Sequence, residues 1–177
     1  TVQASLSNTD TGIGGNPATA TIRIVNAVND APSFIKGSDP TVDEDSGPQI
    51  VRLWATGISP GPPDEGAQIV QFDVTPDKRE LFLSSGQPLI SSDGTLTFTP
   101  APDANGTTTV TVILKDNGGV ANGGMDTSSP QFFTITIRPV NDAPVNIVPP
   151  AQTVNEDMFL VFRRASGNSV SVSDVDA

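Results

Sequence analysis

The stretch TLTFTPAPDANGTTTVTVILKDNGG, Thr95–Gly119, decides the fold. Leu96 and Phe98 alternate with threonines, and the same alternation returns after the turn-forming segment APDANG at 101–106. The apolar positions of this second run are Val110, Val112 and Leu114. A period of two is typical of strands that have one buried face and one face in water. The stretch therefore predicts two amphipathic β-strands joined by a turn.

The alternation continues on both sides of this stretch, and no segment shows a helical period. Turn signals such as SPGPPDEG at 59–66 separate the apolar runs. The predicted strands lie near residues 33–42, 49–55, 68–74, 80–84, 94–99, 107–115 and 131–138. About seven short strands in about 110 residues predict an all-β fold, an immunoglobulin-like Greek-key β-sandwich. Trp54 is then expected to be a core aromatic residue of the second strand.

Composition restricts the chemistry that this chain can perform. Asp and Glu number 20 against 9 Lys and Arg, and the net charge of −11 argues against a nucleic-acid partner. The chain has no cysteine and no histidine, which excludes thiol catalysis, serine–histidine hydrolysis and the usual zinc and iron sites. Carboxylate chemistry on hard cations or glycosides remains, but no pair of carboxylates can be assigned to a cleft. We therefore expect no enzymatic activity.

Two motifs recur at one spacing. VNDAP stands at 28–32 and again at 140–144, and TVDEDSG from Thr41 returns at the same distance as TVNEDMF from Thr153. We call this distance the repeat spacing. The opening residues, which include TATIR at 19–23, likewise parallel the region from Thr109 that includes TITIR at 134–138. A shared spacing is the signature of a repeat. The predicted units are the end of one repeat (1–32), a complete repeat (33–144) and the start of a third (145–177).

Chain order assigns the acidic loops to the two ends of the complete sandwich. We call the two ends the first junction, next to the VNDAP segment at 28–32, and the second junction, next to the one at 140–144. The oxygen-bearing residues expected at the first junction are Asn29, Asp30, Asp64, Glu65, Asp116 and Asn117. Those expected at the second junction are Glu44, Asp45, Asp103, Asn105, Asn141 and Asp142.

Carboxylate, amide and turn carbonyl oxygens suit a hard cation with six to eight ligands, and calcium better than magnesium. In VNDAP the proline would end strand pairing and hold the preceding residue extended. Asp and Asn also form turns without any metal, and one such loop alone favours that plainer interpretation. Three segments that converge at each of two junctions favour calcium.

These motifs resemble the cadherin-like tandem repeats, VCBS-type and related, of bacterial surface and secreted proteins. The resemblance rests on VNDAP, VDEDSG and VNEDMF, FTPAPDANGTTTVTVILKDNGG, and SVSVSDVDA near the end, and it covers essentially all of the chain. It implies calcium ligands at the second junction from Glu44, Asn141, Asp142, Asp174 and Asp176. At the first junction it implies Asn29, Asp30, Asp64, Glu65 and Asp116. The linker reads NDA where cadherins have NDN, and PPDEG matches the cadherin DxD loop only loosely.

The function expected from these patterns is a calcium-stiffened extracellular or cell-surface spacer and adhesion module. Its partners would be neighbouring repeats and an unidentified surface protein or glycan. A glycan-binding sandwich is the alternative, although one Trp, eight Phe and no Tyr offer few stacking residues. No apolar run has the length of a membrane span, and no leader opens the sequence. Exposed strand edges in the partial repeats are expected to favour strand exchange between copies.

Overall fold

A computed structural model describes residues 28–176 of the 177-residue chain. Most of the predicted first unit, residues 1–27, lies outside the described residues, as does Ala177. The described part contains strands and short 3-10 helices and no α-helix. This confirms the all-β prediction.

The first five strands are β1 (Ser33–Ile35), β2 (Thr41–Asp43), β3 (Gln49–Val51), β4 (Thr56–Ser59) and β5 (Gln71–Pro76). They are followed by β6 (Leu89–Ile90), β7 (Leu96–Phe98), β8 (Gly106–Lys115), β9 (Gln131–Arg138), β10 (Val145–Ile147) and β11 (Ser171–Ser173). The 3-10 helices are η1 (Pro63–Glu65), η2 (Arg79–Leu81), η3 (Ala121–Gly123) and η4 (Arg164–Ser166).

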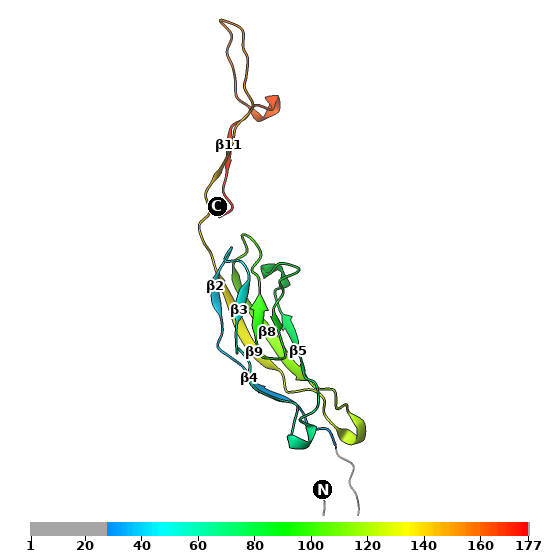
Figure 1. Ribbon diagram of the computed structural model, residues 1–177. Coiled ribbons are helices and arrows are strands. Elements are labelled where there is room, and N and C mark those ends of the chain that lie inside the picture. Colours follow the sequence, from blue (N-terminus) through cyan, green and yellow to red (C-terminus); the bar gives the residue numbers. More distant parts are fainter. Residues whose placement is uncertain (1–27, 177) are drawn as a thin grey trace, which may run out of the picture.

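Two layers of strands form a β-sandwich (Figure 1). One layer is the sheet β2-β9-β8-β5, in which β2 runs parallel to β9 and the other pairs are antiparallel. The other layer holds the antiparallel sheet β3-β7-β6 and the antiparallel pair β1·β4. The Ala55 N–H donates to Gly94 O at 2.9 Å, which continues the bonding of β3 to β7 toward β4.

Three predicted strands differ from the observed ones. The segment 33–42 divides into β1 and β2, which join different layers, with Pro40 directly before β2. The predicted strand 49–55 is a strand only over β3, because Leu53 has a positive φ of 53° and interrupts the extended backbone, and β4 begins after the predicted range. The strand at 80–84 is wrong: helix η2 occupies its start, and β6 forms the sheet edge instead. Leu81 and Phe82 are both buried, whereas in a strand consecutive side chains face opposite sides.

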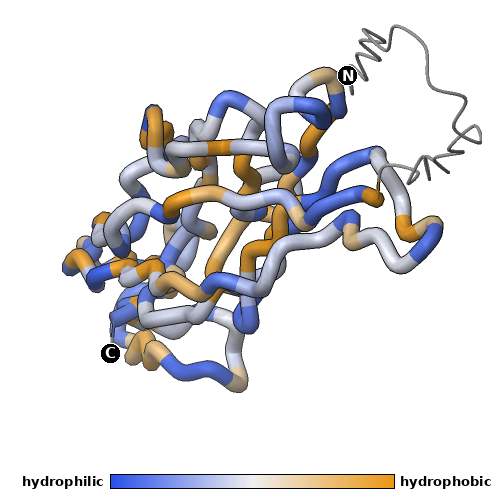
Figure 2. Tube along the Cα trace, turned by 90° about the horizontal axis from the view of Figure 1, so that it is seen from below, coloured by the Kyte–Doolittle hydropathy of each residue, from blue (hydrophilic) through white to orange (hydrophobic). Residues whose placement is uncertain are grey.

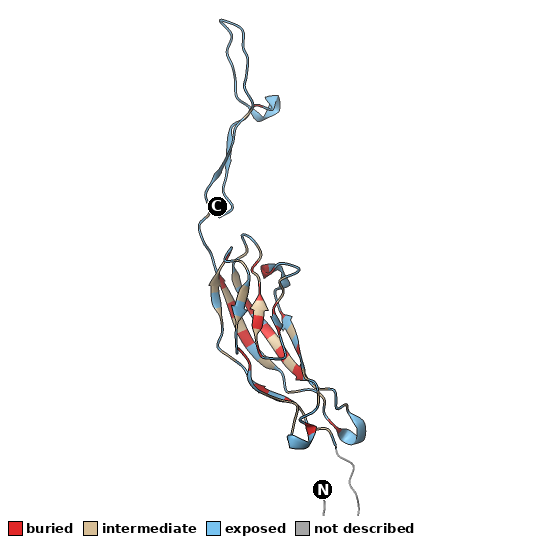
Figure 3. Ribbon diagram, in the orientation of Figure 1, coloured by how far each residue is buried: buried red, intermediate tan, exposed pale blue. Residues whose placement is uncertain are grey.

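The core lies between the two layers, where alternate side chains of each strand meet (Figure 3). Seen end-on, apolar and polar residues are interspersed along the chain (Figure 2). Phe34 packs edge-on against Phe72, with ring centroids 5.1 Å apart, and Trp54 packs against Phe133 at 4.4 Å. Trp54 is 3% exposed, and its indole N–H donates to Ser38 O at 2.9 Å, so it is a core aromatic residue as predicted. It lies between β3 and β4, however, and not within a strand.

The C-terminal residues form a separate hairpin. Strands β10 and β11 pair antiparallel, and the chain between them extends away from the sandwich (Figure 1). Strand β10 follows β1 at the repeat spacing, and β1 also pairs antiparallel with a later strand across an intervening loop. Asp45 and Asp157, again one repeat spacing apart, have nearly the same positive φ, 59° and 63°. The hairpin therefore reproduces local features of the start of the sandwich.

The neighbouring residues Phe132 and Phe133 on β9 offer a matched test of the core. Phe133 is 2% exposed and Phe132 is 57% exposed, because they face opposite sides of the sheet. We expect Phe133→Ala to lower the free energy of unfolding by about 3–5 kcal/mol, through lost burial and an unfilled cavity. Phe132→Ala should cost about 1 kcal/mol or less. Urea denaturation of both variants measures this, and equal losses would contradict the packing described.

Candidate functional site

The parallel pairing of β2 with β9 builds the second junction. Parallel strands end at the same edge of a sheet, so residues 44–47 after β2 lie beside the linker 139–142 after β9. Strand β8 is antiparallel to β9 and begins at this edge, which adds the loop 101–105. Three segments distant in sequence thus meet where the chain leaves the sandwich.

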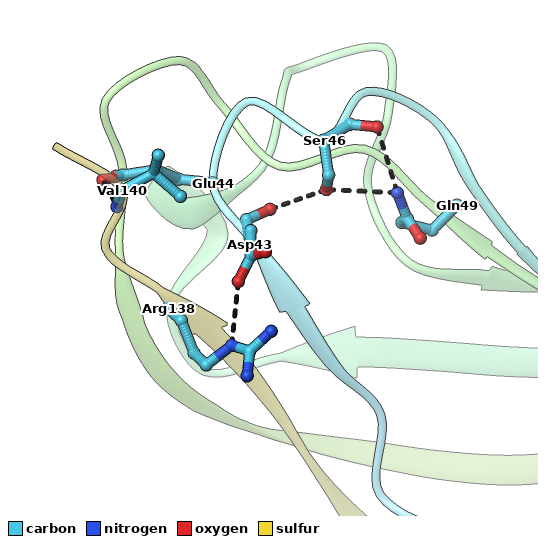
Figure 4. A network of polar contacts seen from close by, with 6 residues as sticks. All are labelled: Asp43, Glu44, Ser46, Gln49, Arg138 and Val140. Carbon is cyan, nitrogen blue, oxygen red and sulfur yellow. Dashed lines mark hydrogen bonds and ion pairs between the residues drawn. The ribbon is translucent and has the colours of Figure 1, made fainter. Parts of the chain in front are cut away.

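Glu44 ties these three segments together, and Figure 4 shows it beside Val140 of the linker. Its side chain is only 2% exposed, and its two carboxylate oxygens accept hydrogen bonds from Val140 N–H at 2.8 Å and from Asn105 Nδ2 at 3.1 Å. Its own N–H donates to Arg138 O at 2.9 Å. Beside it, Arg138 Nε donates to Asp43 Oδ1 at 2.8 Å in an exposed ion pair. The buried carboxylate therefore fixes the start of the linker against the sandwich.

Three aspartates converge next to this contact. Asp45, Asp103 and Asp142 each place a carboxylate oxygen so that all three oxygens lie within 4.8 Å of one another. In the described part of the chain, no other group of three acids brings its oxygens this close. Asp45 and Asp103 have positive φ values, 59° and 55°, a conformation that aspartate tolerates better than most residues. The Asp103 N–H donates to Asp45 Oδ1 at 3.4 Å, which joins the two loops.

Asp142 is the least exposed member of this group. Its Oδ2 atom is buried and has no hydrogen-bond partner among the described residues. Burial is the largest cause of a raised pKa for the Asp142 carboxyl, and repulsion from four neighbouring carboxylates adds to it. In decreasing order of effect these neighbours are Asp176, Asp103, Asp45 and Glu44. An oxygen in this position lacks a positively charged or hydrogen-bonding partner, and a divalent cation would supply one.

The C-terminal hairpin adds two more acids. Asp142 N–H donates to Asp176 Oδ2 at 2.6 Å, and Asp176 N–H donates to Asp174 Oδ1 at 3.0 Å. Asp103 and Asp142 line a surface groove together with Asp174. Asn141 is exposed, and its Nδ2 donates to Asp142 O at 2.8 Å. The predicted residues Glu44, Asp142, Asp174 and Asp176 thus lie around one linker.

At the first junction, Asn29 is held by several partners. Its Nδ2 donates to Asp116 Oδ1 at 3.0 Å and to Met125 O at 2.6 Å, and its Oδ1 accepts from Gln68 Nε2 at 2.7 Å. Gly118 lies so close that a Cβ there would collide with Asn29 Oδ1, which explains the glycine in the turn after Asp116. Both the nitrogen and the oxygen of the Asn29 side-chain amide are therefore hydrogen-bonded.

Acidic side chains at the first junction retain unpaired oxygens. Glu65 is 8% exposed, and its Oε1 accepts from Asp30 N–H at 2.9 Å, while its Oε2 is buried without a hydrogen-bond partner within residues 28–176. Asp116 Oδ2 and Gln68 Oε1 are likewise buried and have no partner in the described part of the chain. Asp30 and Asp64 are exposed. This end brings Glu65 and Asp116 toward the linker, but no three of its acids form a close group within the described residues.

One contact occurs at both junctions. Asp30 N–H bonds to Glu65, 35 residues later, and Asp142 N–H bonds to Asp176, 34 residues later. Asp30 and Asp142 are themselves one repeat spacing apart. At each junction, a carboxylate that follows the second strand of a β-pair therefore accepts from the aspartate of VNDAP.

The sequence assigned Asp45 and Asp103 to the correct end but left them out of the ligand set that the resemblance implied. The sequence did contain a pattern that could have indicated them as ligands. Each is an aspartate in a turn that contains glycine or asparagine, DEDSG and PDANG. Glu44 was included in that set, and both of its oxygens are occupied by hydrogen bonds within the protein.

The two-layer arrangement, with parallel first and last strands of one sheet and a buried Trp, defines an immunoglobulin-like β-sandwich module. The model of the bacterial Ig domain family matches residues 29–129, more than half of the chain, and the chain belongs to this family. Domains of this family are generally structural rather than enzymatic, and they commonly occur in surface or extracellular proteins. No curated protein matches the chain. None of the helices within residues 28–176 combines the length and the apolar character needed to cross a bilayer.

The buried Glu44 carboxylate can be tested with Glu44→Gln. Glutamine replaces one acceptor oxygen with an NH₂ group, which would face a donor on either Val140 or Asn105. We expect a loss of about 1–3 kcal/mol in the free energy of unfolding in the presence of a chelator. The control Asp43→Asn removes a charge from an exposed ion pair and should cost about 1 kcal/mol at most. Equal effects in chemical denaturation would argue against the buried contact.

The raised pKa of Asp142 predicts a pH dependence without metal. Because its folded-state pKa lies above the unfolded value, its contribution favours the folded state at pH below the unfolded pKa and is lost as the pH rises through the folded pKa. At neutral pH in chelator, Asp142→Asn should therefore melt at a higher temperature than the wild type. The difference should disappear on acidification, as thermal melts across pH 3–8 would show. A lower melting temperature for the variant at neutral pH would contradict this assignment.

Proposed function

We propose that this chain is part of a tandem array of Ig-like repeats that serves as an extracellular spacer and adhesion module, and that calcium stiffens its junctions. The units would be residues 1–32, 33–144 and 145–177. The observation that carries the proposal is the convergence of the Asp45, Asp103 and Asp142 oxygens within 4.8 Å. The buried, unpaired Asp142 Oδ2 and the hard oxygen character of all donors fit a calcium ion.

Electrostatics gives the reason for stiffening. The three aspartates repel one another, and Asp174 and Asp176 add negative charge from the hairpin side of the linker. Without a cation, this repulsion favours separation of the hairpin from the sandwich. With calcium, oxygens from both sides of the linker would bind the same ion or adjacent ions. The linker would then resist bending.

The first junction supports the same proposal, because it contains acids on the other side of a linker. Its Glu65 and Asp116 belong to the repeat after the linker, whereas Asp45 and Asp103 belong to the repeat before the second linker. The repeated contact from the VNDAP aspartate to a downstream carboxylate relates the two ends. A complete junction would thus combine acids of the Asp45 and Asp103 type with acids of the Glu65 and Asp116 type.

The glycan-binding alternative has less support. The only Trp is buried in the core, and the exposed aromatic residues within 28–176 are the three phenylalanines Phe132, Phe159 and Phe162. Phenylalanine lacks the polar edge with which Trp and Tyr combine stacking and hydrogen bonding. No specific arrangement of these residues favours a sugar site.

Calcium should raise the melting temperature, and Asp142→Asn and Asp103→Asn should each abolish most of the rise. At about 100 times the dissociation constant, a ligand that binds only the folded state adds about 2.7 kcal/mol. Extracellular modules bind calcium at about 10⁻⁴–10⁻³ M, which sets the concentrations for calorimetry. The control Asp73→Asn removes the same charge from β5, where Asp73 pairs with Lys115. It should retain the full calcium effect.

Magnesium and sodium salts at matched ionic strength separate coordination from screening. Magnesium should stabilise less than calcium, because it holds its waters and requires a regular octahedron. Equal shifts with all three salts would show that the acids are only a screened surface. The effect of Asp142→Asn on stability should also change sign with calcium. The variant should be more stable than the wild type in chelator and less stable in calcium.

A distance measurement tests whether calcium stiffens the linker. The chain has no cysteine, so one cysteine at Thr109, on an exposed position of β8, and one at Val148 in the hairpin can be labelled specifically. Calcium should narrow the distribution of distances between the two labels. An unchanged distribution despite calcium binding would separate the binding from the proposed mechanical role.

A further inference from the structure

Asparagine is followed directly by glycine at three places in the chain, Asn105, Asn117 and Asn122. In such a pair the backbone nitrogen of the glycine can attack the side-chain carbonyl carbon of the asparagine, because glycine has no Cβ to obstruct the approach. The glycine nitrogen loses its proton and forms the new C–N bond, the C–N bond to the side-chain amide breaks, and ammonia leaves. Water then opens the resulting cyclic imide at either carbonyl, which gives aspartate or isoaspartate.

The structure restrains Asn105 at both of the groups that would react. Its Nδ2 donates to the buried Glu44 Oε2 at 3.1 Å. Gly106 begins strand β8 and pairs with Ile137 of β9. Ring closure would leave an oxygen of the buried Glu44 carboxylate without its donor, which is costly. The folded sandwich therefore protects this pair.

Asn117 is restrained in the same two ways. Its Oδ1 accepts from the Ile69 N–H at 2.8 Å, so the side-chain carbonyl is held away from the backbone that follows it. The Gly118 N–H donates to Asp116 Oδ1 at 2.9 Å, so the attacking nitrogen is also engaged. Both hydrogen bonds must break before the ring can close.

Asn122 has neither restraint. It is exposed in η3, and its side chain forms no hydrogen bond within residues 28–176. No side chain in this part of the molecule accepts from the Gly123 N–H, and a Cβ built on Gly123 would meet open space. Asn122 and Gly123 have positive φ values of 55° and 88°, so neither belongs to a strand ladder. The two reacting groups are therefore free to approach each other.

The loop that contains this pair also holds the linker at the first junction. The Met125 N–H donates to Asn29 O at 2.9 Å, and Asn29 Nδ2 donates to Met125 O at 2.6 Å. A Cβ built on Gly124 would lie 3.0 Å from Asn29 Cβ, so the loop backbone packs directly on the linker. A change in the length of this loop would therefore act on Asn29.

Isoaspartate changes that length. The Gly124 N–H donates to Ala121 O at 3.0 Å and closes a tight turn around Asn122 and Gly123. In isoaspartate the backbone runs through the side-chain carbonyl carbon, which adds one bond inside this turn. The turn must open or shift, and Gly124 and Met125 follow it directly.

We propose that Asn122 is a site of spontaneous deamidation, and that isoaspartate at this position loosens the hold of the loop 116–126 on the first-junction linker. The reaction needs only water, and it adds one negative charge to this end of the sandwich. It uses no bound cation, so it is independent of the calcium proposed above.

Peptide mapping of aged protein tests the site against two internal controls. Trypsin cleaves after lysine and arginine, which places Asn105 in the peptide 80–115 and both Asn117 and Asn122 in the peptide 116–138. Fragmentation by mass spectrometry separates the last two. In folded protein at mildly alkaline pH, Asn122 should become a mixture of isoaspartate and aspartate at least tenfold faster than the other two. In a urea concentration that unfolds the chain, all three should convert at similar rates.

An isoaspartate-specific carboxyl methyltransferase should label the aged wild type, and Asn122→Ser should lose this label, because serine has no side-chain amide. Equal conversion of the three asparagines in the folded protein would overturn the proposal, whether all are fast or all are protected. Labelling of Asn122→Ser as strong as that of the wild type would also overturn it.

Hydrogen exchange tests the effect on the linker. Aged protein with isoaspartate at this position should exchange the Met125 N–H at least tenfold faster than fresh wild type. Freshly purified Asn122→Asp adds the charge without lengthening the backbone, and it should keep the slow exchange. The Ala55 N–H, which donates to Gly94 O in the other layer of the sandwich, should exchange equally in all three proteins. Equal Met125 exchange in aged protein and in Asn122→Asp would contradict the loosening.

Discussion

The parallel pairing of β2 with β9 is the constraint on which the rest of the structure depends. It makes the first and last strands of one sheet end at the same edge, and it therefore brings the DED turn next to the outgoing linker. Glu44 then becomes buried and must accept hydrogen bonds, which it finds on the linker backbone and on Asn105. The meeting of Asp45, Asp103 and Asp142 follows from the same edge. Each of these groups would be an ordinary surface residue if the two strands ended apart.

The sequence predicted the sandwich because its strands alternate cleanly, as Leu96, Phe98 and the β8 residues show. The prediction failed where the local geometry of a turn determines the secondary structure. Leu53 adopts a positive φ that no propensity scale would assign to leucine, and helix η2 turns a hydrophobic run into a 3-10 turn with two adjacent buried residues. Strand β6 has only two residues, too few for a period to be recognised. Pattern reasoning is reliable for β8 and β9, which are long and regular, and unreliable for the short edge elements.

The candidate site was predictable to the level of the loop but not of the atom. Chain order alone placed the Glu44, Asp103 and Asn141 loops at one end, and the structure brings these loops together. It could not show that Glu44 is fully occupied by protein donors, nor that Asp142 has an unpaired buried oxygen. Those distinctions depend on burial and register, which are properties of the packed chain. The side-chain bonds of Asn29, which join three loops at the first junction, were equally invisible in the sequence.

The strand order also has a consequence for a chain under tension. The polypeptide enters the sandwich at one end, before β1, and leaves it at the other, after β9. A pull on the two ends therefore acts along β2 and β9 in opposite directions, parallel to the strands and across their hydrogen bonds. Bonds loaded in this shearing geometry must break together, whereas bonds at the end of a hairpin open one after another. The Glu44 contacts to Val140 and Arg138 lie at the point where the load leaves the sheet. A module with this topology is suited to transmit force along its length without opening.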